Sequence, residues 1–166
     1  MTEKDEVLLL IRKSLEEVYN NDIRLIKIKA SERAVVAKFA CYFAHIIKDS
    51  FINQYDIDVE YNRYESAVKK LSNSDSSVTI DFVVHKRTKH DNMIAIEFKT
   101  HWYKDEEKLE DDEDRTQDLC TNENYEYKFG FTIVLGEDLK STVIKFYNKE
   151  TYAFEEIDLF LPEEEI

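Results

Sequence analysis

Apolar residues recur at helical spacing in two segments of the N-terminal half of the chain. Residues 4–19 carry apolar side chains three or four positions apart, which predicts an amphipathic helix. Ser31 is a residue type that favours helix N-caps, and the apolar stripe after it predicts a helix that ends near residue 50. On the wheel of this second helix, Glu32 falls within the apolar stripe. Residues 23–29 alternate only loosely, and we expect a short strand or an extended entry segment there.

Alternation of apolar and polar residues predicts strands in the rest of the chain. We expect strands at 57–64, 78–85, 93–99, 129–135 and 142–148, a hairpin connection at 86–92, a polar loop at 72–77, a helix at 104–120, and either an edge strand or a short helix at 151–160. This order of elements predicts one α/β domain over residues 1–166, a sandwich in which helices flank a mixed central β-sheet.

The two strands of the predicted hairpin place charged residues on one side of the sheet. In the first strand, Ile80 and its even-numbered neighbours form one face and Asp81 lies on the other. In the second strand, Glu97 and Lys99 share the less apolar face. Aspartate is disfavoured within strands, so its position between two apolar residues is unusual. Because a short hairpin pairs the two strands, we expect two carboxylates and one ammonium group to converge.

Such a group is typical of a site for a hard divalent cation. Mg²⁺ and Mn²⁺ prefer oxygen ligands, so we predict Asp81, Glu97 and the helix-borne Glu32 as metal ligands, with the backbone carbonyl of Phe98 as a further oxygen donor. Lys99 would orient a water molecule or stabilise negative charge on a phosphate. Each residue alone has a simpler explanation, since E-x-K on a strand is commonly a surface charge pair and an acid in a first helical turn complements the helix dipole. The prediction therefore depends on the order of all four residues.

The net charge of −13 at first counts against a nucleic-acid ligand. The excess lies in two segments: residues 105–118 hold nine acids and two bases, and residues 155–166 hold six acids and no base. The remaining chain holds 21 acids and 21 bases and is neutral. We expect the two acidic segments to form a solvated helix face and a solvated tail. With two glycines in the chain, glycine-rich loops that cradle phosphates are excluded.

Composition also bears on the cellular setting. No apolar run approaches the roughly 18 residues that a membrane helix needs, and the first residues lack the features of a signal peptide. Cys41 and Cys120 form no recognisable motif. We therefore expect a soluble cytoplasmic protein without a membrane partner.

The order of these residues resembles that of the restriction-endonuclease-like, or PD-(D/E)XK, nuclease superfamily. The similarity covers most of the chain and runs through SERAVVAKFACYFAHI, VEYNRY, IDFVVHKR, IAIEFKTHW and DRTQDLCTNENYEYKFGFTIVLG. The resemblance implies that Asp81 and Glu97 are catalytic residues that bind Mg²⁺ or Mn²⁺, that Lys99 is the catalytic lysine, and that Glu32 completes the metal shell. Ile80 departs from the family pattern, which usually has proline at this position. That proline shapes the backbone and is not a ligand.

The function that this resemblance implies is metal-dependent hydrolysis of DNA phosphodiester bonds. We predict phosphate contacts from Arg63, Lys86 and Arg87, with a solvated strand face and a soluble hairpin tip as the alternatives. One small acidic domain offers few phosphate contacts, which favours a homodimer or a protein partner. A second hypothesis is a non-enzymatic interaction protein on the same fold, either catalytically inactive or acting as an acidic DNA mimic toward a nucleic-acid-binding partner.

Overall fold

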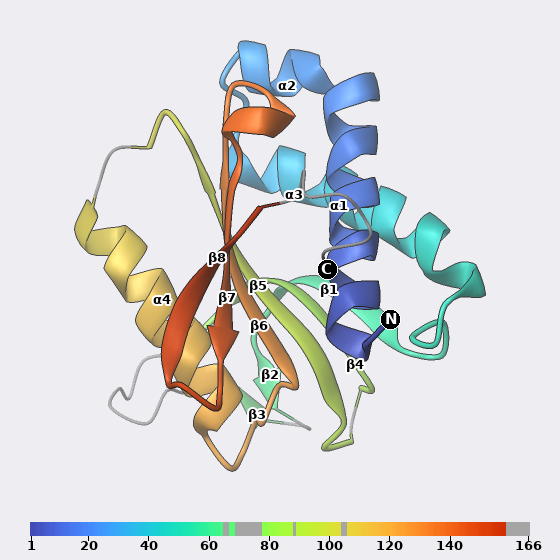
Figure 1. The fold of residues 1–166 in the computed structure, drawn as a ribbon, viewed down its shortest axis with the longest axis vertical. Helices are drawn as coiled ribbons and strands as arrows, with labels where there is room; N and C mark the ends of the chain where they lie inside the picture. Colours follow the sequence, from blue (N-terminus) through green and yellow to red (C-terminus); the bar gives the residue numbers. More distant parts are fainter. Residues whose placement is uncertain (65–66, 69–77, 88, 104–105, 159–166) are drawn as a thin grey trace.

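The computed structural model of the chain describes residues 1–64, 67–68, 78–87, 89–103 and 106–158 (Figure 1). Within them, the helices are α1 (Glu3–Asn21), α2 (Ile23–Lys27), α3 (Glu32–Ile46) and α4 (Glu106–Thr121), with short 3-10 turns η1 (Ile47–Asp49) and η2 (Leu139–Ser141). The strands are β1 (Asp56–Tyr61), β2 (Arg63–Tyr64), β3 (Ala67–Val68), β4 (Ile80–His85), β5 (Asn92–Thr100), β6 (Phe129–Leu135), β7 (Val143–Asn148) and β8 (Ala153–Ile157). The predicted mixed α/β class is confirmed.

The main sheet has six strands in the order β1-β4-β5-β6-β7-β8. Neighbouring strands are antiparallel except for β5 and β6, which are parallel. A parallel pair needs a crossover connection, and α4 lies in the segment that makes it. Strands β2 and β3 pair with each other in a separate small sheet.

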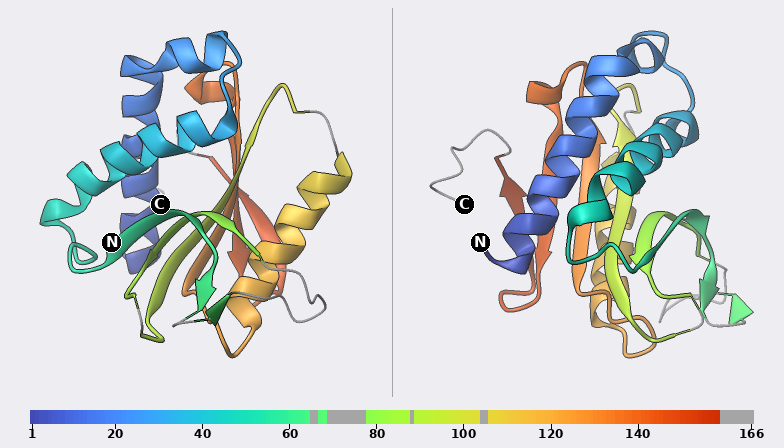
Figure 2. Two further views of the ribbon diagram at one scale, coloured as in Figure 1. Left: turned by 180° about the vertical axis from the view of Figure 1, so that it is seen from behind. Right: turned by 90° about the vertical axis from the view of Figure 1, so that its right-hand side faces the viewer.

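Helices cover both faces of the main sheet. Helices α1 and α3 lie on one face, and α4 lies on the other (Figures 1 and 2). Under α3, the ring of Phe39 meets those of Phe82 and Phe98 edge to face, a geometry that aromatic pairs prefer. A smaller core cluster under α4 includes Tyr127 and Tyr147. The strands between these two layers are therefore apolar on both faces, and a charged side chain placed there is buried.

Local interactions fix where the N-terminal helices begin and how they meet the sheet. The side chain of Thr2 caps α1, and that of Ser31 accepts a hydrogen bond from the backbone N–H of Ala34 at the start of α3. Near the end of α1, the Tyr19 hydroxyl donates to the carbonyl of Gly136 after β6. The predicted cap at Ser31 is thus confirmed, and it places Glu32 at the first position of α3.

Residues 23–29 form neither the strand nor the extended segment that we predicted. Ile23–Lys27 is a helix instead. Ile26 is buried in the core, and Ile23 and Leu25 are partly buried against it. Asp22 holds the junction with α1 by accepting a hydrogen bond from the Tyr42 hydroxyl of α3. This tertiary contact outweighs the weak local preference of a five-residue segment.

The predicted alternation also fails at the start of β4. Ile80 packs in the α4-side core cluster with Val83, whereas Phe82 packs against α3. Pairing between β4 and β5 ends at Phe82 opposite Ile96, so the two strands separate just before that point. This separation carries Ile80 into the other layer and leaves space between the strands for the side chain of Asp81.

Most other predicted elements are confirmed with small changes. The strand predicted at 57–64 is divided between β1 and β2. The helix at 104–120 corresponds to α4, and 151–160 contains the edge strand β8. The loop predicted at 72–77 lies outside the described residues. No described helix is both long and apolar enough to cross a membrane.

Candidate functional site

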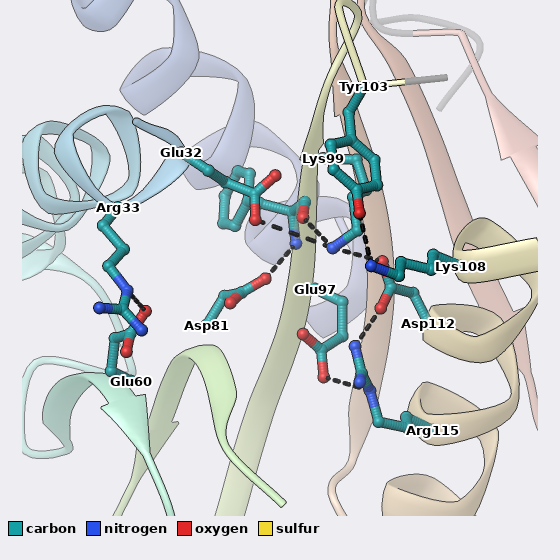
Figure 3. Close-up of polar contacts among 11 residues, drawn as sticks. Glu32, Arg33, Glu60, Asp81, Glu97, Lys99, Tyr103, Lys108, Asp112 and Arg115 are labelled. Atoms are coloured by element: carbon teal, nitrogen blue, oxygen red, sulfur yellow. Dashed lines mark hydrogen bonds and ion pairs between the residues drawn. The ribbon is translucent and has the colours of Figure 1, made fainter. Parts of the chain in front are cut away.

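Acidic side chains from α3, β4 and β5 point toward one space at the place where β4 and β5 separate (Figure 3). Asp81 reaches across this gap, and its Oδ2 accepts a hydrogen bond of 2.8 Å from the backbone N–H of Phe98. A side-chain carboxylate thus takes the role that a backbone carbonyl would play in a continued ladder. Asp81 is thereby fixed beside Glu97, as the sequence predicted.

Glu97 lies within β5 and is only 2% exposed. Its Oε1 is buried and accepts no hydrogen bond from any described residue. The cation paired with it is Arg115 of α4, whose Nε lies 3.3 Å from Oε1. Burial raises the pKa of Glu97 well above its usual range, and the neighbouring carboxylate of Asp81 raises it further, while Arg115 opposes the rise. An ionised Glu97 in this position needs a cation.

Lys99 sits two positions further along β5 and contacts two carboxylates. Its Nζ lies 2.8 Å from Oδ2 of Asp112 and 3.7 Å from Oε1 of Glu32. It also donates a 3.0 Å hydrogen bond to the backbone carbonyl of Phe98, the oxygen that we predicted as a metal ligand. Burial alone would lower the pKa of Lys99, but the hydrogen bond and charge of Asp112 outweigh burial, and the pKa is raised. Lys99 is therefore an ammonium group at neutral pH.

Glu32 completes the predicted set from the opposite side of the gap. Burial raises its pKa to about 7; the Asp81 and Asp112 carboxylates add to the rise and Lys99 opposes it. All four residues of the sequence-based site, Glu32, Asp81, Glu97 and Lys99, thus lie around one space. Lys99 forms an ion pair with Glu32. Asp81 is held to β5 by its hydrogen bond with the backbone of Phe98.

Two residues of α4 belong to the same cluster and were missed by the sequence analysis. We expected the acidic segment 105–118 to be a solvated helix face, but Asp112 is only 3% exposed. It accepts a short hydrogen bond from Arg115, whose pKa is raised because Glu97 and Asp112 outweigh the effect of burial. Asp112 shares a helix face with Thr116 and Leu119, both fully buried. An acid within this stripe was the available signal, as it was for Glu32.

The donor set of the cluster is compatible with a divalent cation. Fully ionised, its acids outnumber its bases by two: the acids are Glu32, Asp81, Glu97 and Asp112, and the bases are Lys99 and Arg115. A dication would balance this excess, and carboxylate oxygens are the ligands that Mg²⁺ and Mn²⁺ take. As placed, no three acidic, histidine or cysteine side chains of the described residues stand close enough to hold one ion.

An open cleft leads to the cluster. It has a volume of about 570 Å³ and is lined by Ser31, Glu32, Arg33, Glu60, Thr79, Asp81 and Arg115. At its rim, Nε of Arg33 contacts Oε1 of Glu60 at 2.7 Å. Behind Glu97, a small cavity of about 50 Å³ lies between α4 and the sheet and is also lined by Lys99 and Asp112. A ligand from solvent would thus meet Asp81 and Arg115 before reaching the buried side of Glu97.

Two of the predicted phosphate-contacting residues, Lys86 and Arg87, do not line this cleft. Lys86 and Arg87 are in the hairpin between β4 and β5, at the opposite end of β5 from Lys99. There they form ion pairs, Lys86 with Asp91 and Arg87 with Asp58. The structure describes the backbone of Arg63 in β2 but not its side chain. The structure therefore does not bring Lys86 and Arg87 together with the acids, and the side chain of Arg63 lies outside what the structure describes.

No protein family, no curated protein and no solved structure matches the chain. The resemblance to PD-(D/E)XK nucleases thus remains a prediction from the order and placement of a few residues.

Proposed function

We propose that this protein is a metal-dependent nuclease of the restriction-endonuclease-like fold that hydrolyses phosphodiester bonds in DNA. The observation that carries the proposal is the position of Asp81, Glu97 and Lys99 around the gap between β4 and β5, beside an open cleft. Two carboxylates can hold a divalent cation for phosphodiester hydrolysis, and a charged lysine beside them can stabilise the charge that develops on phosphate.

Asp81, Glu97 and Glu32 would hold Mg²⁺ or Mn²⁺. Bound there, the ion would polarise the phosphodiester and lower the pKa of a water molecule. The buried Oε1 of Glu97, which accepts no hydrogen bond from the described residues, supports this assignment. The hydrogen bond from the Phe98 N–H keeps Asp81 pointing into the gap, so this ligand is already oriented.

Lys99 would act as a hydrogen-bond donor rather than as a base. Its raised pKa keeps the ammonium group charged at neutral pH. A charged donor beside the cleft stabilises negative charge that develops on phosphate oxygens and orients the attacking water. The contact with Asp112 holds its Nζ on the α4 side of the gap, so Asp112 is a positioning residue for Lys99.

Calorimetric titration of Mg²⁺ and Mn²⁺ into wild type and Glu97→Gln tests the proposal, with plasmid and single-stranded DNA assayed on the same samples. Wild type is expected to bind metal and cleave DNA, and Glu97→Gln to do neither, because a neutral amide is a poor ligand for a hard cation. Glu110→Gln provides the matched control, because Glu110 is exposed on α4. That variant should behave as wild type.

Lys99→Met separates catalysis from metal binding. We expect it to retain the metal and to lose cleavage, because the side chain supplies charge but no ligand atom. Cleavage by Glu97→Gln at the wild-type rate would contradict the proposed mechanism. Absence of metal binding by wild type at millimolar concentrations would restrict the resemblance to the fold.

One observation favours the second candidate, a non-enzymatic interaction protein. Glu110, Asp111 and Asp114 form an exposed acidic row on α4, the kind of charge that a DNA mimic presents to a basic partner. Wild type that binds neither metal nor DNA but captures a nucleic-acid-binding protein, with loss of capture when this row is neutralised, would support that candidate.

A further inference from the structure

Arg115 occupies a position between the buried Glu97 and the open cleft. On one side, its Nε lies 3.3 Å from Oε1 of Glu97. On the other, Arg115 lines the cleft of about 570 Å³ together with Asp81 and Glu32 (Figure 3). Its side chain is 31% exposed although it contacts a carboxylate that is almost completely buried. Arg115 therefore lies between the cleft and Glu97 and contacts both.

The guanidinium group of Arg115 and a divalent cation would compete for the same oxygen, Oε1 of Glu97. No described residue donates a hydrogen bond to this oxygen, and its nearby cation is Arg115. A metal ion bound to the carboxylate would lie a few ångströms from a positive charge, and repulsion at this distance is strong where water is scarce. Binding of metal through Oε1 of Glu97 thus requires that Arg115 move away.

The surroundings allow the side chain to move while α4 stays in place. Thr116, Leu119 and Cys120 are buried and hold the following turn of α4 against the sheet. The partly exposed guanidinium has open space on its cleft side, so the side chain can change rotamer while the backbone of α4 stays in place. Asp112, which it also contacts, is on the same helix and does not need to move.

We infer that Arg115 is a resident counter-ion that neutralises Glu97 in the metal-free protein and is displaced toward the cleft when a divalent cation binds. This inference rests on the proposed function, since it concerns the same metal site. It gives Arg115 a regulatory role: the ion must compete with the guanidinium group, which lowers the apparent metal affinity. Metal binding and the position of Arg115 are then coupled.

Calorimetric titration of Mg²⁺ and Mn²⁺ into wild type, Arg115→Gln and Arg115→Lys tests this coupling without any measurement of cleavage. Arg115→Gln should bind metal about tenfold more tightly or more, because removal of the competing charge relieves the repulsion. Arg115→Lys keeps a positive charge near Glu97, so the repulsion persists and its metal affinity should stay close to that of wild type. In wild type, the ¹⁵N-bound proton signal of the Arg115 Nε, assigned by its absence from Arg115→Lys, should shift during titration with Mg²⁺ as the contact with Glu97 is lost.

The possible results separate this inference from the proposed function. Metal binding by wild type with equal or weaker affinity in folded Arg115→Gln would overturn the role of Arg115 and leave the nuclease proposal intact. If wild type and both variants bind no metal, the inference and the proposed function are both wrong. If Arg115→Gln fails to fold, the Nε signal of wild type decides: a signal unchanged at saturating Mg²⁺ overturns the inference, and a shifted signal supports it.

Discussion

Gly130 of β6 lies beneath α4, and its replacement by alanine tests how closely the helix must approach the sheet. A Cβ atom at this position would lie 2.4 Å from Sγ of Cys120 and 2.8 Å from Cγ2 of Thr116. Both distances are well inside ordinary van der Waals contact, which begins near 3.4 Å. The glycine does not have a positive φ, so it is required by the lack of space and not by the backbone conformation.

Two opposing effects decide the magnitude. Alanine restricts the unfolded chain more than glycine does, which stabilises a protein by about 0.4–1 kcal/mol where the backbone is compatible. Overpacking a closed core costs about 1–3 kcal/mol, and both neighbours are buried on a helix that must shift by up to about 1 Å. We expect Gly130→Ala to lower the free energy of unfolding by about 2 kcal/mol, or the Tm by about 4–8 °C in a chain of this size.

Urea denaturation of wild type, Gly130→Ala, Cys120→Ala and the double variant measures this effect. Cys120→Ala removes the closer obstacle, so the double variant should be more stable than the sum of the two single effects implies, by about 1 kcal/mol. An undiminished free energy of unfolding in Gly130→Ala would refute the close approach of α4. Strict additivity in the double variant would refute the assignment of the clash to Sγ of Cys120.

Two further predictions concern the dependence of stability on pH. Burial raises the pKa of Tyr19 from 10.0 to about 12, so the contribution of its neutral hydroxyl to the free energy of unfolding is complete below pH 10 and is lost as the pH rises through 12. In urea denaturation, Tyr19→Phe should be less stable than wild type at pH 7 by about 1 kcal/mol. It should lose less stability than wild type between pH 10 and 12. Burial alone would raise the pKa of Asp58, but hydrogen bonds from Arg87 and His85 outweigh it and hold the pKa below 3.8. Asp58→Asn should therefore lower the free energy of unfolding at pH 7. In the same assay, the difference in free energy of unfolding between this variant and wild type should become smaller as the pH falls below 3.8.

The sequence predicted the long elements of the fold because each has enough residues to show a period. Helices α1 and α3, and strands β5 and β6, have strong apolar patterns and were located correctly. Short elements have too few residues to show such a period. Segment Ile23–Lys27 has a single buried residue, Ile26, so neither period was distinguishable, and only the contacts of Asp22 with α3 show why it is helical.

The site residues on the two strands joined by a hairpin were predicted from the sequence. The site residues on α4 were missed, because only the tertiary packing brings them to the cluster. Asp81, Glu97 and Lys99 lie on two strands that the hairpin joins, so strand pairing was sufficient to bring them close even though the alternation predicted around Ile80 failed. Asp112 and Arg115 reach the cluster only because α4 crosses from β5 to β6 and packs closely over Gly130. In a segment with nine acids, the local signal was that Asp112 shares a helix face with Leu119, and one apolar residue is too weak a pattern to mark a buried acid.

The cluster is better explained by a ligand than by stability. Buried ion networks contribute little to stability, because the cost of removing each charge from water offsets the attraction between partners. Here the acids also outnumber the bases by two, so Glu97 remains beside Asp81 with a single cation, Arg115, near it. A protein that needed only a stable core would gain from an apolar residue at position 97. The open cleft reaches this cluster at Glu32 and Asp81, and the excess of carboxylates supports the proposal that a divalent cation completes the site.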